Sequence, residues 1–459
     1  MVESMMELVS KLSPVTVMFR GTLESIFSDE RLNGVFASHA QRQYCRELTF
    51  ADAARLMVQV VARIRPSINA AYRAEAKAIP VSAAAVYQKL NGTEPAVCEG
   101  LVRETSRATA AVIDELHGSV AGPVPGYDVR ILDGNHLAGT EHRLAELRGH
   151  GAAALPGHTL AVLDPQRRLI EDVVVCEDAH TNQRLLIPRV LERVEAGQCW
   201  IGDSHFCTRG FLLGVHRRDA GFVVRQHQQL QGELLGRRRA AGRCPTGKLY
   251  EQRLRITADD GEVLELRRIT IELDRPTQTG QTQIHLLTNL PPRVRAHRVA
   301  QSYRDRWQIE TAFQEVTVNL RCEIDTLGYP GAALLGFCVA LVLYNALAVV
   351  KAAIRRGTPG AKDAPRNLSM YALADEIAGL WRGLEIVPAA QWHQAFHQRT
   401  ARQLARQLRV LAKDVDLCRF TTCAWTPQHD RPPPTSGNRG NHRATARLIE
   451  KRKSHSQSP

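Results

Sequence analysis

Two aspartates stand where short β-strands are expected to leave a sheet. Asp133 follows the apolar run VRIL, and Asp203 follows the run CWIG. If these two strands are neighbours, the two carboxylates meet at one edge of the sheet. Hard carboxylate oxygens are the ligands that Mg²⁺ and Mn²⁺ prefer in proteins. The pair therefore predicts a divalent-metal site.

Glu310 is the candidate third ligand. It lies in HRVAQSYRDRWQIETAFQEVTVNL, residues 297–320, a segment with the periodicity of a helix. That periodicity places Tyr303, Arg306 and Glu310 on one face. The face offers a carboxylate, a guanidinium that can grip a phosphate through two hydrogen bonds, and a phenol that can donate another. Three carboxylates holding two Mg²⁺ or Mn²⁺ ions suit in-line displacement at phosphorus, so the residues point to phosphoryl transfer.

Each of these residues also has an ordinary structural interpretation. Asp133 precedes a glycine in a common turn dipeptide, and Glu310 can be a surface carboxylate paired with Arg306. Trp307 and Phe313 are spaced to pack on the other side of the helix, so we expect core residues there. For Asp133 considered alone, the structural interpretation as a turn residue is favoured. The matching sequence contexts of Asp203 and Glu310 reverse this and favour a functional site.

Histidines allow a second interpretation of the chemistry. His136 and His205 lie within three residues of an aspartate, as in a zinc or iron phosphoesterase site, but no further nitrogen ligands follow at a recognisable spacing. His393 and His397 have the spacing of zinc ligands on a helix, without the glutamate of H-E-x-x-H. The carboxylate site is the favoured hypothesis.

The elements that must position these residues predict a mixed α/β sheet. YDVRILDGNHL, HTLAVLDP and RLIEDVVVCEDA are expected to be three successive strands, followed by helix, strand, helix and strand over residues 182–227. A second β-rich block follows, with a hairpin signal at Asp260-Gly261. The helix that carries Glu310 comes only after this block, which therefore has the place of an insertion.

The flanking regions are expected to be helical. Near the N-terminus, Ser82 is a plausible N-cap and Asn91-Gly92 a helix stop, which outlines a helix-turn-helix. Gly331–Val350 is almost continuously apolar and is interpreted as a buried core helix rather than a membrane span.

Composition points to a polyanionic partner and a reducing compartment. The 459 residues carry 60 Lys plus Arg against 47 Asp plus Glu, a net charge of +13 that favours nucleic acid. The ten cysteines form no C-x-x-C pair, so reduced thiols and a cytoplasmic location are expected. With nucleic acid as the expected partner, we expect the protein at the nucleoid.

From Tyr127 to Ala348 the sequence resembles the DDE transposases of bacterial insertion sequences, within them the insertion-sequence-four group. LDGNH resembles the segment with the first aspartate, IGDSHF that with the second, and YRDRWQIE the Y-x2-R-x3-E signature. The resemblance implies a ribonuclease-H-like catalytic core interrupted by a β-rich insertion. It implies cut-and-paste transposition, in which the protein binds two kinds of double-stranded DNA, the terminal inverted repeats and the target. It also implies that the protein acts as a homodimer in a synaptic complex.

With this resemblance, we expect six regions along the chain. They are a helical DNA-binding domain (1–122), the first part of the core (123–227), the β-rich insertion (228–292), the second part of the core with the catalytic helix (293–355), a helical C-terminal region (356–425) and a disordered basic tail (426–459). Dimer contacts are expected in residues 368–411.

Two departures from the group affect the expected site. Thr317 occupies the position of a lysine that usually ends the signature, and Arg321, one further turn along, is the nearest basic replacement. The insertion contains no tryptophan for stacking a flipped base, so Phe222 or Tyr250 would have to serve and a hairpin intermediate is in doubt.

A basic cluster in the insertion is expected to hold DNA phosphates near the cut site. It consists of Arg237, Arg238 and Arg239, with Arg243 and Lys248 nearby. Two alternatives stay open. One is a metal-dependent nuclease that cleaves without joining strands. The other is a catalytically inactive, transposase-derived DNA-binding protein, which the missing lysine leaves open.

Overall fold

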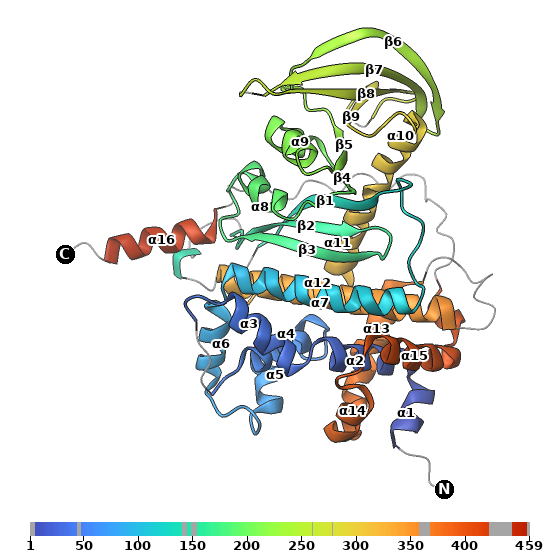
Figure 1. Ribbon diagram of the computed structural model, residues 1–459. Coiled ribbons are helices and arrows are strands. Elements are labelled where there is room, and N and C mark those ends of the chain that lie inside the picture. The colour runs from blue at the N-terminus through green and yellow to red at the C-terminus, as the bar shows by residue number, and fades with distance from the viewer. Residues whose placement is uncertain are drawn as a thin grey trace.

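The computed structural model describes residues 5–43, 47–139, 145–147, 154–258, 260–277, 279–357, 368–421 and 443–456. Figure 1 shows a twisted sheet above a body of helices. Two long helices, α7 (Pro95–Glu115) and α12 (Pro330–Gly357), pack against each other beneath the sheet and contact β3. Apolar side chains of the sheet and of this helical body share one large hydrophobic core.

The described residues form one sheet of nine strands in the order β3-β2-β1-β4-β5-β9-β8-β7-β6. β3, β2 and β1 are antiparallel, whereas β4 and β5 run parallel to β1. The predicted mixed α/β sheet is therefore confirmed. The strands are β1 (Asp128–His136), β2 (His158–Asp164), β3 (Leu169–Cys176), β4 (Gln198–Gly202), β5 (Gly221–Arg225), β6 (Glu233–Cys244), β7 (Gly247–Thr257), β8 (Val263–Leu273) and β9 (Gln283–Thr288).

The β-rich block extends this same sheet rather than forming a separate one. β9 pairs antiparallel with β5, and β8, β7 and β6 follow in turn, so that β6 is the outer edge. The hairpin between β7 and β8 turns at Asp260-Gly261 as expected, and Gly261 has a φ of 89°, which glycine adopts without steric cost.

Short helices connect the parallel strands. The helix expected after residue 182 is shorter than predicted, because a 3₁₀ turn, η2 (Gln183–Leu186), precedes α8 (Ile187–Leu191). The side chain of Asn182 caps the 3₁₀ turn, and the Pro188 ring suits the first turn of α8. A second helix, α9 (Arg209–His216), begins after the capping residue Thr208.

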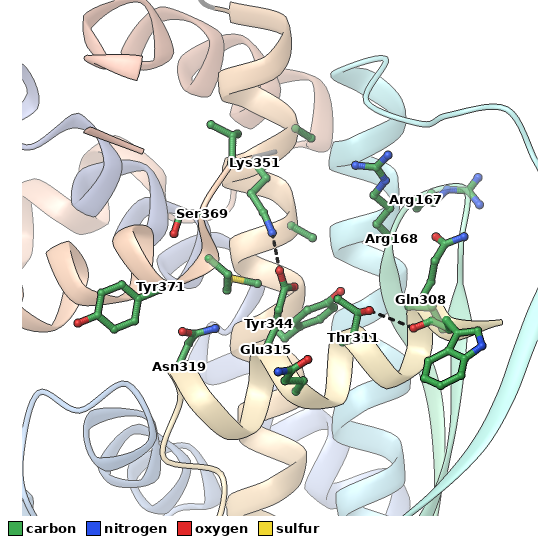
Figure 2. Close-up of a pocket in the computed structure, with 18 of the residues that line it drawn as sticks. Arg167, Arg168, Gln308, Thr311, Glu315, Asn319, Tyr344, Lys351, Ser369 and Tyr371 are labelled. Carbon is green, nitrogen blue, oxygen red and sulfur yellow. Dashed lines mark hydrogen bonds and ion pairs between the residues drawn. The ribbon is translucent and has the colours of Figure 1, made fainter. Parts of the chain in front are cut away.

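Two further helices, α10 (Ala296–Asp305) and α11 (Trp307–Asn319), follow β9 and lead back from the insertion toward the helical body (Figure 1). At its C-terminal half α11 is joined to α12 by an ion pair between Glu315 Oε1 and Lys351 Nζ at 3.2 Å, drawn in Figure 2. This pair fixes the catalytic-helix candidate against the central helix of the core.

The central helix α12 is apolar along most of its length. By length and composition it would be able to cross a membrane, yet 89% of its most apolar window is buried inside the protein, as in a core helix. Asn345 is fully buried and bonds both backbone groups of Ile170, accepting from N at 2.8 Å and donating to O at 2.7 Å. Because β3 is an edge strand, this amide satisfies backbone groups that would otherwise lack a partner.

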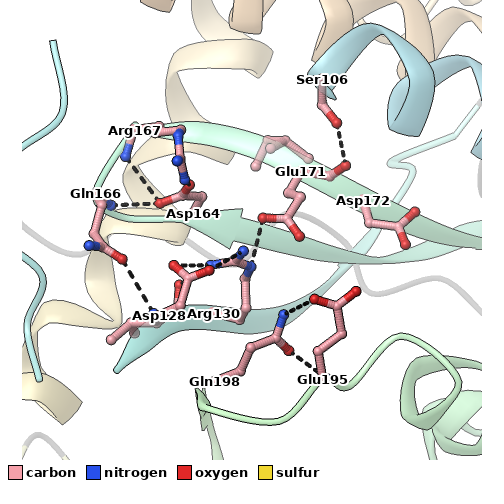
Figure 3. Close-up of polar contacts among 12 residues, drawn as sticks. Ser106, Asp128, Arg130, Asp164, Gln166, Arg167, Glu171, Asp172, Glu195 and Gln198 are labelled. Carbon is pink, nitrogen blue, oxygen red and sulfur yellow. Dashed lines mark hydrogen bonds and ion pairs between the residues drawn. The ribbon is translucent and has the colours of Figure 1, made fainter. Parts of the chain in front are cut away.

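At the other end of β1, buried charges tie the first strands together (Figure 3). The Arg130 guanidinium is buried and bonds Asp128 Oδ1 at 2.8 Å and Glu171 Oε2 at 2.6 Å. Asp164 accepts from the backbone N–H groups of Gln166 and Arg167 at 2.8 and 3.0 Å, which shapes the turn between β2 and β3. These contacts hold the strands in register at the edge away from Asp133.

The N-terminal helices pack onto α12 rather than around a core of their own. As predicted, Ser82 Oγ accepts from Ala85 N at 3.3 Å and α6 ends at Gly92. DNA reading by α6 and α7 stays a prediction. The helices before α7 are α1 (Met5–Leu12), α2 (Pro14–Ile26), α3 (Asp29–His39), α4 (Phe50–Val61), α5 (Ile68–Glu75) and α6 (Ala83–Asn91).

After α12 the chain is again helical, with α13 (Met370–Leu380), α14 (Ala389–Phe396) and α15 (Ala401–Leu411). Where a disordered tail was expected, the structure has α16 (Thr445–Ser456), while residues 422–442 lie outside the described part. Helix-forming residues and two ion pairs account for the difference, Arg447 with Asp178 at 2.7 Å and Arg452 with Glu146 at 2.5 Å.

Candidate metal and phosphate site

The parallel register of β1 and β4 brings the two aspartates to one edge of the sheet. Leu132 lies opposite Gly202, and Asp133 and Asp203 are the next residues of their strands. Asp133 was expected to close its strand; instead, β1 continues along β2 to His136, and only its pairing with β4 stops before Asp133. The prediction failed here because β2 extends further than the shorter β4.

The helix expected over 297–320 is interrupted at Arg306, between α10 and α11. The Arg306 N–H bonds the Tyr303 carbonyl, three residues back, at 3.2 Å, so the chain tightens locally into a 3₁₀ turn. Arg306 nevertheless contacts Glu310 and lies 5.9 Å from the centre of the Tyr303 ring. The three residues meet as the spacing predicts.

Arg306 bridges two of the three carboxylates. Nη1 donates to Asp133 Oδ2 at 2.6 Å, and Nη2 donates to Glu310 Oε1 at 2.5 Å. The Arg306 side chain is 11% exposed, against 17% for Asp133 and 35% for Glu310. The guanidinium therefore links the sheet edge to α11 in a largely enclosed position, where charge-assisted hydrogen bonds are strong.

The electrostatics of Asp133 show that the three acids influence one another. Burial raises the pKa of Asp133 to about 6, against the opposing effects of the Arg306 charge and the Gly134 N–H. The negative charges of Asp203 and Glu310 contribute to this rise. Like charges gathered at a buried position bind a cation favourably, because a cation relieves their repulsion.

Asp203 is held at the strand end by the turn that follows it. Its Oδ1 accepts from the His205 backbone N–H at 2.8 Å, and its Oδ2 lies 2.7 Å from His205 Nδ1. His205 is 70% exposed, while Asp203 is 23% exposed. The backbone of the turn therefore holds Oδ1 of Asp203, and the exposed His205 ring lies against Oδ2.

Arg225 is a candidate residue that the sequence interpretation missed. Val224 of β5 lies opposite Gly202 of β4, so Arg225 stands at the same register level as Asp203 and Asp133. Its guanidinium lies near Tyr303 and donates a hydrogen bond to Gln281 Oε1. Burial raises the pKa of Tyr303, and the nearby charges of Arg306 and Arg225 oppose this rise. The rule that located the two aspartates applies equally to β5 and would have located Arg225.

The donor chemistry fits a hard divalent ion, although the described residues contain no three His, Cys, Asp or Glu side chains close enough to hold one as they stand. Between Asp133 and Glu310 lies the Arg306 guanidinium, a cation that uses the same oxygens as a metal ion would. Its Nε is buried without a hydrogen-bond partner, so the guanidinium is incompletely satisfied in this position. Metal binding at Asp133, Asp203 and Glu310 thus requires the guanidinium to move aside.

The structure does not support the alternative histidine site, because the described residues contain no group of three side chains that could bind a metal ion there. His136 stacks on His158, with ring centres 5.2 Å apart, and burial lowers the pKa of both. His393 and His397 stack on each other with ring centres 3.8 Å apart, and His397 also lies 3.5 Å from Glu30.

The predicted phosphate-binding arginines of the insertion lie on the outer strand β6. Arg237, Arg238 and Arg239 are all exposed there. Arg238 stacks 3.6 Å above the Tyr250 ring and lies 3.5 Å from Glu272, so this one is partly neutralised. DNA binding by the cluster stays a prediction.

Arg321 lies outside the helix that carries Glu310, because α11 ends at Asn319. It therefore does not continue the helical face of Glu310. Its Nη1 donates instead to the Pro66 carbonyl at 2.5 Å. Thr317 bonds its own helix, donating to the Phe313 carbonyl at 2.7 Å.

Three expectations about aromatic residues need comment. Trp307 was expected in the core, but it is 62% exposed, because Ile309, Ala312 and Val316 form the packed face of α11. Phe313 packs against the core as expected. Phe222 is fully buried and therefore unable to stack on a base.

Comparisons with known proteins found one matching family and a similar solved structure. Residues 124–333, which include all three acids, match the family described as transposase DDE domain, and this match supports a DDE transposase. Among solved structures, the chain is similar to a piggyBac transposase synaptic complex with hairpin DNA determined by cryo-electron microscopy. The identity is 10%, the coverage 84% of this chain and 85% of that chain, and the TM-score 0.41. The sequence has no match among curated proteins.

Proposed function

We propose that this protein is a cut-and-paste transposase of an insertion sequence, with a ribonuclease-H-like core in which Asp133, Asp203 and Glu310 hold two Mg²⁺ or Mn²⁺ ions. The observation that supports this most is the convergence of the strand-end aspartates with Arg306 and Glu310, inside the segment that matches the transposase domain. When bound, such ions polarise the attacking oxygen and stabilise the leaving 3′ oxygen.

The residues around the acids have complementary roles in the proposal. Arg306 leaves the carboxylates and grips a phosphate of the DNA strand, and Tyr303, which lies near Arg225, donates a second hydrogen bond. His205 keeps Asp203 in its orientation. The exposed arginines of β6 hold DNA by backbone contacts, which give affinity rather than sequence choice.

The same site is proposed to act twice. Water first attacks a phosphodiester at the element's end, and the freed 3′ hydroxyl then attacks target DNA, so each step exchanges one P–O bond for another. Two protomers on two ends are proposed to form the synaptic complex, with the terminal repeats bound by the N-terminal helices. Contacts within residues 368–411 are proposed to join the protomers.

The proposal is tested with the genomic DNA that flanks the reading frame, a target plasmid and Mg²⁺. Wild-type protein is expected to release the ends and join them to the plasmid. Asp203→Asn is expected to lower cleavage about a thousandfold, since the metal contributes several kcal/mol to the reaction. Asp219→Asn is the matched control, because Asp219 is exposed with a φ of 55° that asparagine tolerates.

Two outcomes would replace the proposal. Cleavage without joined products indicates a nuclease. DNA binding without any cleavage, unchanged in Asp203→Asn, indicates the inactive DNA-binding protein that Thr317 leaves open.

A further inference from the structure

A hollow of about 800 Å³ lies on the side of α11 away from Glu310. Figure 2 shows it between α11, α12, the start of α13 and the turn from β2 to β3. Gln308, Thr311 and Glu315 line it from α11, at positions that helical periodicity separates from Arg306 and Glu310. The hollow is therefore distinct from the carboxylate site, although both use the same helix.

Positive charge gathers in this hollow. Arg168 of the β2–β3 turn and Arg355 of α12 line it, together with Arg304 at the end of α10. Within the part of the chain that the structure describes, none of these three forms an ion pair. Their neighbours differ: Lys351 pairs with Glu315 at 3.2 Å, and Arg167 pairs with Asp114 and Asp164 at 2.9 and 2.8 Å.

Arg168 and Arg355 are close enough to repel each other. Burial and the charge of Arg168 together lower the pKa of Arg355 to about 10. Arg168 is also held at a φ of 59°, a conformation that is uncommon for a residue with a side chain. Asp305 and Glu315 also line the hollow, and Glu315 partly offsets the charge of Arg355, but its carboxylate is paired with Lys351. A bound anion would relieve the remaining repulsion between the two arginines, and guanidinium groups match the geometry of a phosphate.

We propose that this hollow binds a backbone phosphate of DNA through Arg168 and Arg355. This inference rests on the proposed function, to which it adds a second DNA contact on the far side of the catalytic helix. It predicts that DNA touches α11 from both sides, at the carboxylates and at the hollow.

The test measures binding of a fluorescein-labelled DNA duplex to full-length protein at several salt concentrations. Arg168→Asn removes the charge and keeps a residue that accepts a positive φ, so folding is preserved. Loss of one phosphate contact is expected to reduce the slope of log K against log salt by about 0.9. Arg355→Gln is expected to do the same, whereas Arg356→Gln, an exposed arginine beside Arg355 that does not line the hollow, is the control.

An unchanged slope in both Arg168→Asn and Arg355→Gln would overturn the inference. A second arm adds sodium phosphate alone and follows the melting temperature. One result is that phosphate raises the melting temperature of wild type and not of Arg168→Asn, while the salt slope of DNA binding stays the same in both. That result assigns the hollow to a free phosphate compound and also overturns the DNA contact. If wild-type protein cleaves and joins DNA, but Arg168→Asn and Arg355→Gln bind DNA with the same salt slope as wild type, only this inference fails. Asp203→Asn, which is expected to lose cleavage, is expected to keep the wild-type salt slope.

Discussion

At the residue scale, the central feature is a guanidinium between two carboxylates. Arg306 contacts Asp133 at 2.6 Å and Glu310 at 2.5 Å, and these oxygens are also the proposed metal ligands. A metal ion bound as proposed would therefore compete with Arg306 for the same acids. Without an ion, Arg306 supplies the positive charge that keeps a buried cluster of acids tolerable.

This competition predicts how an Arg306→Gln variant responds to Mg²⁺. Without metal, the variant is expected to be about 1–3 kcal/mol less stable than wild type, because Asp133 loses its charged partner. Adding Mg²⁺ or Mn²⁺ is expected to raise its melting temperature at least about 2 °C more than that of wild type. Thermal unfolding with and without metal measures both effects. The competition would be contradicted if metal raised the melting temperature of Arg306→Gln no more than that of wild type. It would also be contradicted if Asp133→Asn showed the same extra rise as Arg306→Gln.

The sequence predicted these residues well where one rule of geometry was sufficient. Helical spacing placed Arg306 beside Glu310, and the strand ends placed Asp133 beside Asp203. The bridge from Arg306 to Asp133 joins residues far apart in the chain, so no local pattern contains it. Trp307 was misplaced because the packed face of a helix depends on what lies against it.

At the element scale, β9 joins the core sheet to the insertion, and His285 lies in that strand. Burial, together with the charges of Arg268 and Arg238, lowers the pKa of His285 to about 4. Its Nδ1 lies 3.0 Å from Thr270 Oγ1 of β8. The folded protein thus holds this imidazole neutral between two strands of the insertion.

The lowered pKa predicts that acid destabilises the fold through His285. Between pH 6.5 and 4 the unfolded chain binds a proton that the folded chain does not, so this group's contribution to stability is complete above 6.5 and declines as pH falls. At pH 5 the loss is about 1–2 kcal/mol. Urea unfolding at pH 7.5 and 5 is expected to show a smaller pH effect in His285→Gln; an identical pH effect would refute this role.

The elements were predicted better than their connections. The alternation of apolar and polar residues and the Asp260-Gly261 turn correctly predicted β7 and β8. Both signals are local in the sequence, so they can be recognised without knowledge of the fold. The pairing of β9 with β5 is non-local and was not predicted, although it makes the insertion part of the sheet. The break at Arg306 was likewise missed, because the helical periodicity of the sequence continues through this position.

At the scale of the whole molecule, α12 joins the N-terminal helices, the sheet and the C-terminal helices in one core. Its hydrophobicity alone did not distinguish a core helix from a membrane span. The distinction comes from the helices packed around it and from Asn345, whose amide meets the edge strand β3. We therefore expect the regions that share this core to depend on one another for stability.

Replacement of Asn345 tests this dependence. Asn345→Leu leaves the buried N–H and C=O of Ile170 without partners and is expected to lower the free energy of unfolding by about 2–4 kcal/mol. Leu343→Met, at a fully buried position in the same helix, is the control and is expected to cost less than about 1.5 kcal/mol. A loss in Asn345→Leu no larger than in the control would show that the edge contact contributes little.

The most direct test of the central claim exchanges a proposed metal ligand for sulfur. Asp203→Cys presents a softer donor, which Mg²⁺ accepts poorly and Mn²⁺ accepts better. With the flanking DNA as substrate, wild-type protein is expected to cleave with either metal, whereas Asp203→Cys is expected to be inactive with Mg²⁺ and to recover cleavage with Mn²⁺. Cleavage by Asp203→Cys in Mg²⁺ at the wild-type rate would contradict a metal site at Asp203.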